Sequence, residues 1–223
     1  MVLPLVTPLP RFEEQVGALQ SHLIDPDRED VYLASVHDQE MVLREDPDFR
    51  WRLLLGSHIE PGRHLLIDCW RDEQAMQLAL AASRTLASAA ALLEPQAVTV
   101  GTVLQIAGFP LEEDGASDIE FALTVENWVK EPCLAEYLES LRAQGQRQEQ
   151  EQGFRHRLML REVGEELHFH VVDLWSTEAA AFDSVSRRQS SPLEAVRFLG
   201  LLAERGRTVP AWATLRTASR HSG

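Results

Sequence analysis

The stretch FRWRLLLGSHIEPGRHLLIDCWRDEQA, residues 49–75, recurs without a gap as FRHRLMLREVGEELHFHVVDLWSTEAA, residues 154–180. Phe, two Arg and two Leu open both copies, and Asp, Trp, Glu and Ala close them in the same order and spacing. An internal repeat of this kind indicates that one supersecondary unit occurs twice in the chain. We therefore expect a tandem fold built from two similar halves.

Each copy predicts a strand, a turn, a second strand and a helix. Apolar and polar residues alternate in FRWRLLL and FRHRLML, which is typical of strands. The segments EPG (60–62) and VGE (163–165) then supply turn residues. DE (72–73) and STE (176–178) suit the start of a helix, because capping side chains and negative charge stabilise that end. A β-hairpin followed by a helix is the natural interpretation of each copy.

Further elements complete each half. A long helix is expected from about residue 131 to residue 150, where the first half has only a short connection at 37–48, and another helix is expected at 192–206. Each half then has the order β-α-β-β-α-β of the ferredoxin-like motif. The strands expected before the hairpins and after the helices are DVYLASV (30–36), AVTVGTVLQIAG (96–107), DIEFALTV (118–125) and VPAWATLRTA (209–218).

Two sheets of this kind can pack face to face and bury the faces that their helices leave bare, with a cavity between them. The segment GFPLEEDGAS, residues 108–117, has the composition of a domain joint. We predict an α+β fold of two fused ferredoxin-like repeats that form an intramolecular α/β barrel. An N-terminal extension is expected over 1–29, the first repeat over 30–108, and the second repeat, with the active site, over 118–218.

Composition and charge exclude several classes of partner. Hydrophobic residues make up 44% and charged residues 25% of the chain, as in ordinary globular proteins. The net charge of −14 argues against nucleic-acid and anionic-membrane surfaces, which need clustered cations. Two cysteines are too few for a disulfide framework, and no apolar run is long enough for a membrane span. We expect a cytoplasmic monomer or homodimer.

The element order and two short motifs resemble the dimeric α/β barrel superfamily, in particular the antibiotic biosynthesis monooxygenase group. The motifs are FHVVDLWSTEAA (169–180) and the weaker DCWRDEQA (68–75), in which a strand ends in Trp and Glu-x-Ala opens a helix. The resemblance implies oxygenation of anthrone-like aromatic polyketides by dioxygen, without a metal and without a cofactor, or with reduced flavin. Other members of the fold degrade haem or isomerise small acids.

The resemblance also implies roles for particular residues. In that group an Asn on the first strand, an Asn four residues before the strand-end Trp, and that Trp are implicated together. Asn127 matches the first Asn and Trp175 matches the Trp, whereas Val171 stands at the position of the second Asn. We expect Asn127, Trp175 and Asp173 to be catalytic, with Asp173 or a histidine replacing the missing amide.

Strand parity separates the tryptophan from the histidines, because successive side chains point to opposite faces. His168 and His170 share one face, and Asp173 and Trp175 share the other. The equivalent of the histidine face in the first copy holds Leu65, Ile67 and Cys69 after Arg63 and is the more uniformly apolar of the two, so we assign that face to helix packing and the Asp/Trp face to the cavity. Arginines at the cavity could hold a phenolate, a carboxylate or a flavin phosphate. The candidate substrate-binding residues are Trp70, Arg155, Arg157 and His170.

Plainer alternatives stay open for these residues. Both copies keep an Asp at positions 68 and 173, which favours a shared structural task such as capping the next helix. The pair His168-x-His170 could chelate a metal, but the first copy lacks it and no close carboxylate partner accompanies it in sequence, so no metal site is predicted. The missing second Asn leaves open a non-oxidative relative, such as a polyketide cyclase or a small-ligand-binding protein. A haem-binding or haem-degrading protein is favoured less.

Overall fold

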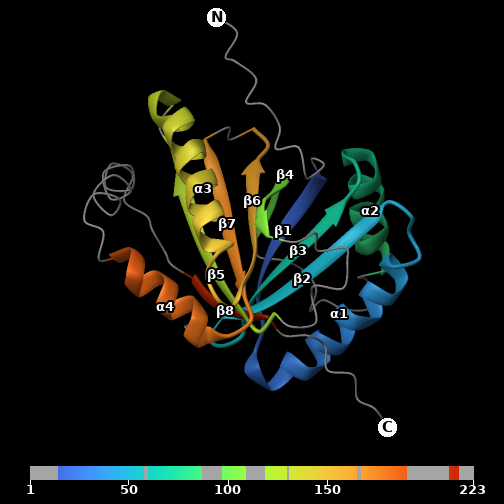
Figure 1. Cartoon of the computed structure of the whole chain (residues 1–223). Coiled ribbons are helices and arrows are strands. Elements are labelled where there is room, and N and C mark those ends of the chain that lie inside the picture. The colour runs from blue at the N-terminus through green and yellow to red at the C-terminus, as the bar shows by residue number, and fades with distance from the viewer. Residues whose placement is uncertain are drawn as a thin grey trace, which may run out of the picture.

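The computed structural model describes residues 15–57, 60–86, 97–108, 119–129, 131–164, 167–189 and 211–215. Over these ranges eight strands close into one barrel in the order β1-β3-β2-β8-β5-β7-β6-β4 (Figure 1). The strands are β1 (Gln15–Leu23), β2 (Phe49–Ser57), β3 (Arg63–Trp70), β4 (Ala97–Gly108), β5 (Phe121–Trp128), β6 (Phe154–Glu162), β7 (His168–Trp175) and β8 (Ala211–Leu215). The helices are α1 (Glu29–Leu43), α2 (Glu73–Leu86), α3 (Leu134–Gln148) and α4 (Glu178–Gln189), with 3-10 turns η1 (Pro26–Arg28) and η5 (Glu131–Cys133).

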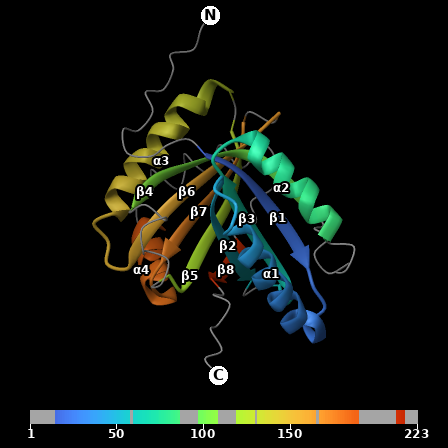
Figure 2. The same cartoon turned by 90° about the vertical axis from the view of Figure 1, so that its right-hand side faces the viewer.

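The barrel consists of two antiparallel sheets of the same internal order. The first sheet runs β4-β1-β3-β2 and the second runs β8-β5-β7-β6. They join where β4 pairs with β6 and where β2 pairs with β8. Helices α1 and α2 lie outside the first sheet, and α3 and α4 lie outside the second (Figures 1 and 2). The predicted α+β barrel of two fused ferredoxin-like repeats is confirmed.

The two hairpins and the helix starts that follow them form where the repeat predicts them. Gly62 and Gly164 adopt left-handed φ values of 78° and 90° in the turns, a conformation that glycine enters without a side-chain clash. The Asp72 carboxylate accepts a hydrogen bond from the backbone N–H of Ala75 at 2.9 Å and caps α2. The Thr177 hydroxyl likewise accepts one from Ala180 at the start of α4, at 3.2 Å.

The start of the first half differs from the prediction. The strand expected at 30–36 is wrong, because these residues belong to α1, and the expected short connection at 37–48 is largely the rest of that helix. The first strand is β1, which lies inside the predicted N-terminal extension. Tyr32, Val36 and Leu43 are buried at spacings of four and seven, as on one face of a helix, while Val31 is 54% exposed. Both halves therefore carry a helix between their first two strands.

Other predicted boundaries shift slightly or fall on undescribed residues. Strand β5 starts and ends three residues later than predicted, so Asn127 lies within it. Strand β8 lies inside the predicted segment 209–218. The joint after residue 108 and the helix predicted at 192–206 lie outside the described residues.

The barrel interior is an apolar cluster to which both sheets contribute. It includes Ile67 and Cys69 of β3 and Val172 and Leu174 of β7. The assignment of this face to helix packing is therefore wrong, and so is the assignment of the Asp/Trp face to a cavity between the sheets. The cause is that both faces of each sheet are buried, one against helices and one against the other sheet, so apolarity alone does not identify the inner face.

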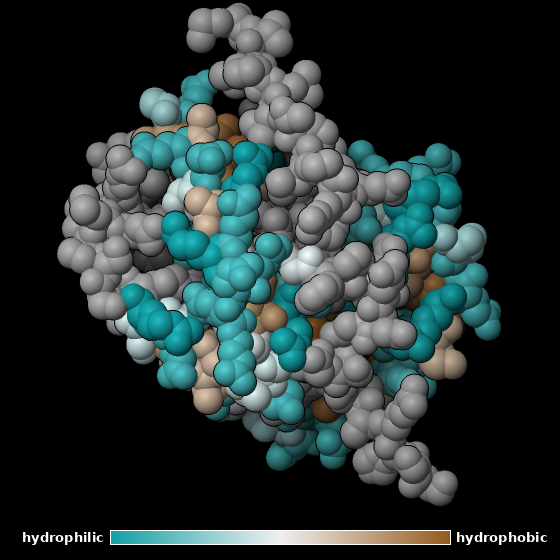
Figure 3. All heavy atoms as spheres, in the orientation of Figure 1, coloured by the Kyte–Doolittle hydropathy of each residue, from teal (hydrophilic) through white to brown (hydrophobic). Residues whose placement is uncertain are grey.

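The face of the molecule seen in Figure 3 is mostly polar where it is described. Figure 3 shows hydrophilic residues over much of the described part of one side of the molecule, with small hydrophobic areas between them. Among the described helices, none combines the length and apolarity that crossing a membrane requires.

Candidate functional site

Asn127 lies beneath α3, on the helix side of the second sheet. Its neighbour across the β5–β7 ladder is Phe169, and its side chain is buried and close enough to Tyr137 of α3 to affect the pKa of that residue. Burial raises the pKa of Tyr137 above its usual range, against smaller lowering effects of Arg157 and Asn127. The Tyr137 hydroxyl therefore keeps its proton at neutral pH. The apolar residues around this pair are Val129, Leu141, Met159, Phe169 and Val171.

Arg157 and Asp173 form a buried ion pair in the same layer. The guanidinium donates two hydrogen bonds to the carboxylate, at 2.6 and 2.7 Å. Gln148 donates a further bond to Asp173 at 3.0 Å, and Gln144 accepts one from Arg157 at 2.9 Å. Arg157 is 2% exposed and Asp173 is 5% exposed, so the pair is desolvated and depends on these bonds for its stability.

The first repeat contains the same pair. Arg52 donates two hydrogen bonds to Asp68, at 2.6 and 2.8 Å, and a third to the Val36 carbonyl of α1 at 3.2 Å. The Asp and the second Arg that both copies share are thus mutual partners. Both aspartates therefore occur in the same kind of ion pair beneath a helix, and the helix capping expected for them is not what they do.

The two tryptophans pack on the helix side of their sheets. Trp175 contacts Phe154 edge to face at a centroid distance of 5.2 Å and lies in the cluster beneath α4. Trp70 contacts Phe49 in the same way at 5.9 Å and lies beneath α2. Among the predicted site residues, Arg157 and Asp173 pair beneath α3, and Asn127 lies beneath the same helix, opposite Phe169, four residues along the ladder from Asp173, while the tryptophans lie elsewhere. Arg155 is half-buried and donates to the Phe154 carbonyl at 3.1 Å.

A histidine–tyrosine cluster beneath α1 was not predicted. Tyr32 lies between His22 and His64, at centroid distances of 5.4 and 4.9 Å, and all three are buried. His64 lies 3.2 Å from the Glu29 carboxylate. Burial, with the charges of His64 and Arg52, lowers the pKa of His22 to about 4, so this imidazole is neutral near pH 7.

His22 and Asn127 occupy equivalent positions of the two repeats. His22 lies opposite His64 on β3, as Asn127 lies opposite Phe169 on β7. In the described part of the chain neither ring nitrogen of His22 has a hydrogen-bond partner. Aligning residues 15–23 with β5 would have revealed this equivalence, but the sequence interpretation placed them outside the first repeat.

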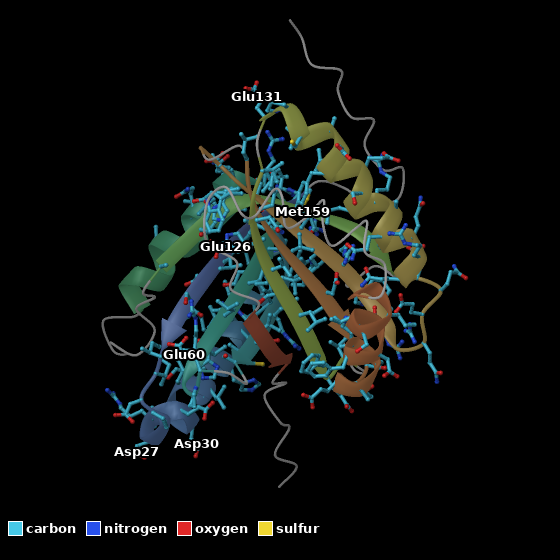
Figure 4. All side chains as sticks on the ribbon, turned by 90° about the vertical axis from the view of Figure 1, so that its left-hand side faces the viewer. Asp27, Asp30, Glu60, Glu126, Glu131 and Met159 are labelled. Carbon is cyan, nitrogen blue, oxygen red and sulfur yellow. The ribbon has the colours of Figure 1, made fainter. Side chains whose placement is uncertain are left out.

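A second polar cluster lies inside the barrel, at the mouth where β5 and β6 end and β7 begins. The His168 Nε2 atom lies 2.8 Å from a Glu126 carboxylate oxygen, and its Nδ1 atom is hydrogen-bonded to Glu162. His170 lies beside His168, with ring centroids 4.6 Å apart, and Trp128 stacks on His168 at 4.3 Å. In Figure 4 the label of Glu126 lies near the upper end of β5, below the label of Glu131.

This cluster corrects one argument from the sequence. The histidine pair does have close carboxylate partners, which β5 and β6 supply from outside its own strand. Burial, with the charge of His168, also lowers the pKa of His170 to about 4. The residues at the equivalent positions of the first repeat are Ser21, Leu23, Ser57, Arg63 and Leu65.

Comparison with known proteins establishes the fold but no family. No protein-family model matches the sequence, and no curated protein matches it. A proposed monooxygenase from Fusobacterium nucleatum subsp. nucleatum superposes with a TM-score of 0.69 at 10% identity, over 92% of this chain and 94% of that chain. An anthrone oxidase-like protein superposes with a TM-score of 0.60 at 14% identity, over 92% of each chain.

A chlorite dismutase from Candidatus Nitrospira defluvii, in complex with imidazole, superposes with a TM-score of 0.56 at 13% identity, over 92% of each chain. These neighbours differ in the activities that their names state. At such identities the likeness establishes the shared barrel fold, and the fold alone does not assign an activity.

Proposed function

We propose that this protein is a monooxygenase that oxidises a polycyclic aromatic polyketide with dioxygen, without a cofactor or with the help of reduced flavin. The observation that carries the proposal is the buried proximity of Asn127 and Tyr137 beneath α3, which places two neutral hydrogen-bond donors among apolar residues. The fold it shares with proposed monooxygenases and an anthrone oxidase-like protein supports the same class of reaction.

The chemistry requires donors that stabilise negative charge in a water-poor environment. An anthrone-like carbon loses a proton, and the carbanion, with its charge on the neighbouring oxygen, passes electrons to dioxygen. A carbon–oxygen bond forms, and loss of water from the hydroperoxide leaves a carbonyl, so that one CH₂ and one O₂ give one C=O and one H₂O. The Asn127 amide and the Tyr137 hydroxyl can donate hydrogen bonds to the oxyanion, a contribution that is largest where water is excluded.

The substrate's own acidity can supply the deprotonation step. A CH₂ group between aromatic rings and opposite a carbonyl forms a stabilised anion, so a strong base is not required. Arg157 adds a fixed positive charge beside Tyr137 that favours the anion. In this proposal Asp173 positions Arg157 and does not itself contact the substrate.

Oxygen consumption with an anthrone-like substrate, with and without reduced flavin, tests the proposal. We expect Asn127→Leu to reduce kcat/KM by roughly 10²–10³-fold, the usual effect of removing one oxyanion donor, with the free energy of unfolding nearly unchanged. His22→Asn, at the equivalent position of the first repeat, is the matched control and should retain activity. Wild-type protein that consumes no oxygen in either assay, or an Asn127→Leu variant of full activity, contradicts the proposal.

A non-oxidative relative, such as a polyketide cyclase or a ligand-binding protein, is the second candidate. It is favoured by Val171, which stands where the resemblance implies a second Asn and packs into the apolar cluster beneath α3. Such a protein has fewer donors for an oxyanion than the oxygenases that it resembles. Turnover of an aromatic polyketide under strictly anaerobic conditions would favour this candidate over the oxygenase.

A further inference from the structure

We propose that the barrel mouth where β5 and β6 end and β7 begins is a binding site for a divalent transition-metal ion, with Glu126, His168 and His170 as ligands. The proposal does not depend on the oxygenase function, because these residues lie inside the barrel, whereas Asn127 and Tyr137 lie beneath α3. Its test measures ion binding and requires no turnover.

The geometry of the three side chains suits such an ion. Each offers one ligand atom, and these atoms all lie within 4.8 Å of one another. Zinc and related ions hold imidazole nitrogen and carboxylate oxygen at about 2.0–2.2 Å, so neighbouring ligand atoms lie roughly 3 Å apart. Glu126 and His168 already approach to 2.8 Å, and the ligand atom of His170 lies within 4.8 Å of both. Two histidines with one carboxylate form a ligand set typical of zinc and of non-haem iron.

The histidines reach one ion because of the strand geometry. His168 and His170 are two residues apart on β7, so their side chains point to the same face of the sheet. Glu126 lies directly opposite His170 in the β5–β7 register. In the described part of the chain the buried Nε2 atom of His170 has no hydrogen-bond partner. Buried nitrogen atoms are normally hydrogen-bonded or coordinated, and a metal ion at this point would give Nε2 of His170 a partner.

The surroundings of His168 match those of a metal-bound imidazole. Glu162 is hydrogen-bonded to Nδ1, which leaves Nε2 for the ion, and this carboxylate–histidine–metal arrangement orients the ring and raises its basicity. Trp128 stacks on the imidazole with an interplanar angle of 11° and fixes its plane. A bound ion would take the place of the direct contact between Nε2 and Glu126.

Access and charge also agree with ion binding. The Glu126 side chain is 37% exposed and that of Glu162 is 24% exposed, so an ion can enter from solvent. The two carboxylates balance the charge of a divalent ion. The equivalent positions of the first repeat hold Ser21 and Leu65 in place of Glu126 and His170. The first half therefore forms its part of the barrel without these ligand side chains, and their presence in the second half is not a requirement of the fold.

Titration of chelator-treated full-length protein with Co²⁺, followed by displacement with Zn²⁺, tests the proposal. We expect one ion per chain, measured by calorimetry and by the visible absorption of protein-bound Co²⁺. Glu126→Ser and His170→Leu introduce the residues of the first repeat and should each abolish measurable binding. Glu162→Ser removes only the partner of His168 and should weaken binding by about 10–100-fold. His37→Gln, at an exposed position of α1, is the control and should bind like wild type.

Circular dichroism verifies that each variant is folded, and Glu126→Gln with His170→Gln provide a second pair if the first does not fold. Wild-type protein that binds neither Co²⁺ nor Zn²⁺ stoichiometrically overturns the proposal. Metal binding that persists at full strength in folded Glu126→Ser or His170→Leu protein also overturns it. So does a loss of metal binding in His37→Gln that equals the loss in the ligand variants. None of these results bears on oxygen consumption, so the two proposals can fail separately.

Discussion

Arg157 donates two hydrogen bonds to Asp173 in the buried layer between the second sheet and α3. Arg52 and Asp68 repeat this arrangement beneath α1. Each partner alone would be an uncompensated charge out of contact with water. The two pairs thus explain why both copies of the repeat keep an Arg on the first hairpin strand and an Asp on the second.

Removing one member of the buried pair should destabilise the protein strongly. We expect Arg157→Met to lower the free energy of unfolding by about 3–5 kcal/mol, because Asp173 is left as a buried charge. The control is Arg71→Met, which breaks the exposed pair with Asp48 and should cost at most about 1 kcal/mol. Urea denaturation measures both values. Equal effects of the two substitutions would contradict the assigned role of the buried pair.

Stability should depend on pH through His22. Its pKa is about 4 in the folded protein and ordinarily 6.5, so between these pH values the unfolded chain binds a proton that the folded chain does not. Stability therefore falls as the pH drops from 6.5 to 4, by up to about 3 kcal/mol for this group. His22→Asn, the residue of the second repeat, removes this contribution.

The measurement is the difference in unfolding free energy between wild type and His22→Asn, determined by urea denaturation from pH 7 to pH 4. His64, Tyr32, Glu29 and Arg52 are present in both proteins, so their direct contributions largely cancel. We expect the difference to shift in favour of His22→Asn as the pH falls. Parallel stability curves for the two proteins would show that the folded state tolerates a charged His22.

Trp175 should contribute to stability more than to turnover. The side chain is fully buried against Phe154 and α4, so Trp175→Ala should cost about 3–5 kcal/mol of unfolding free energy. Trp175→Phe keeps an aromatic ring there and should retain most of kcat/KM for oxygen consumption. Denaturation and oxygen-electrode assays test the two expectations. A Trp175→Phe variant of normal stability that loses its activity would instead support the catalytic role implied by the resemblance.

The hairpin glycines should differ in their tolerance of a side chain. Both have positive φ, which costs an L-residue about 1–2 kcal/mol. A Cβ atom at Gly62 would also lie 2.0 Å from the Ile24 carbonyl oxygen, whereas one at Gly164 would meet nothing within 4 Å. Gly62→Ala should therefore reduce the melting temperature more than Gly164→Ala. Calorimetry measures the melting temperature of both variants. A lower melting temperature for Gly164→Ala than for Gly62→Ala would contradict the described packing of the first hairpin.

The internal repeat predicted the parts of the fold that depend on local sequence. The hairpins at 49–70 and 154–175, their turns and the following helix starts agree with the alternation and capping residues of the two copies. The strand predicted at 30–36 is wrong because the apolar residues of so short a segment fit a strand as well as a helix. Only the longer spacing from Tyr32 to Leu43 reveals the helical face.

The candidate sites depend on contacts that a single strand does not encode. Parity correctly separated His168 and His170 from Asp173, but the identity of the inner face depends on how the two sheets close. Glu126 meets His168 across 42 residues of chain, through the pairing of β5 with β7. Neighbouring residues of the sequence therefore give no sign of that carboxylate, although both histidines stand out in it.

The joints between β4 and β6 and between β2 and β8 have an evolutionary consequence. In a homodimer of single repeats, a substitution in one half of the barrel appears in the other half too, because rotational symmetry makes the halves identical. Covalent fusion of the repeats removes that constraint. One half of this barrel can acquire acidic and imidazole groups while the other keeps small and aliphatic ones, so a gene duplication can specialise one half without altering the other.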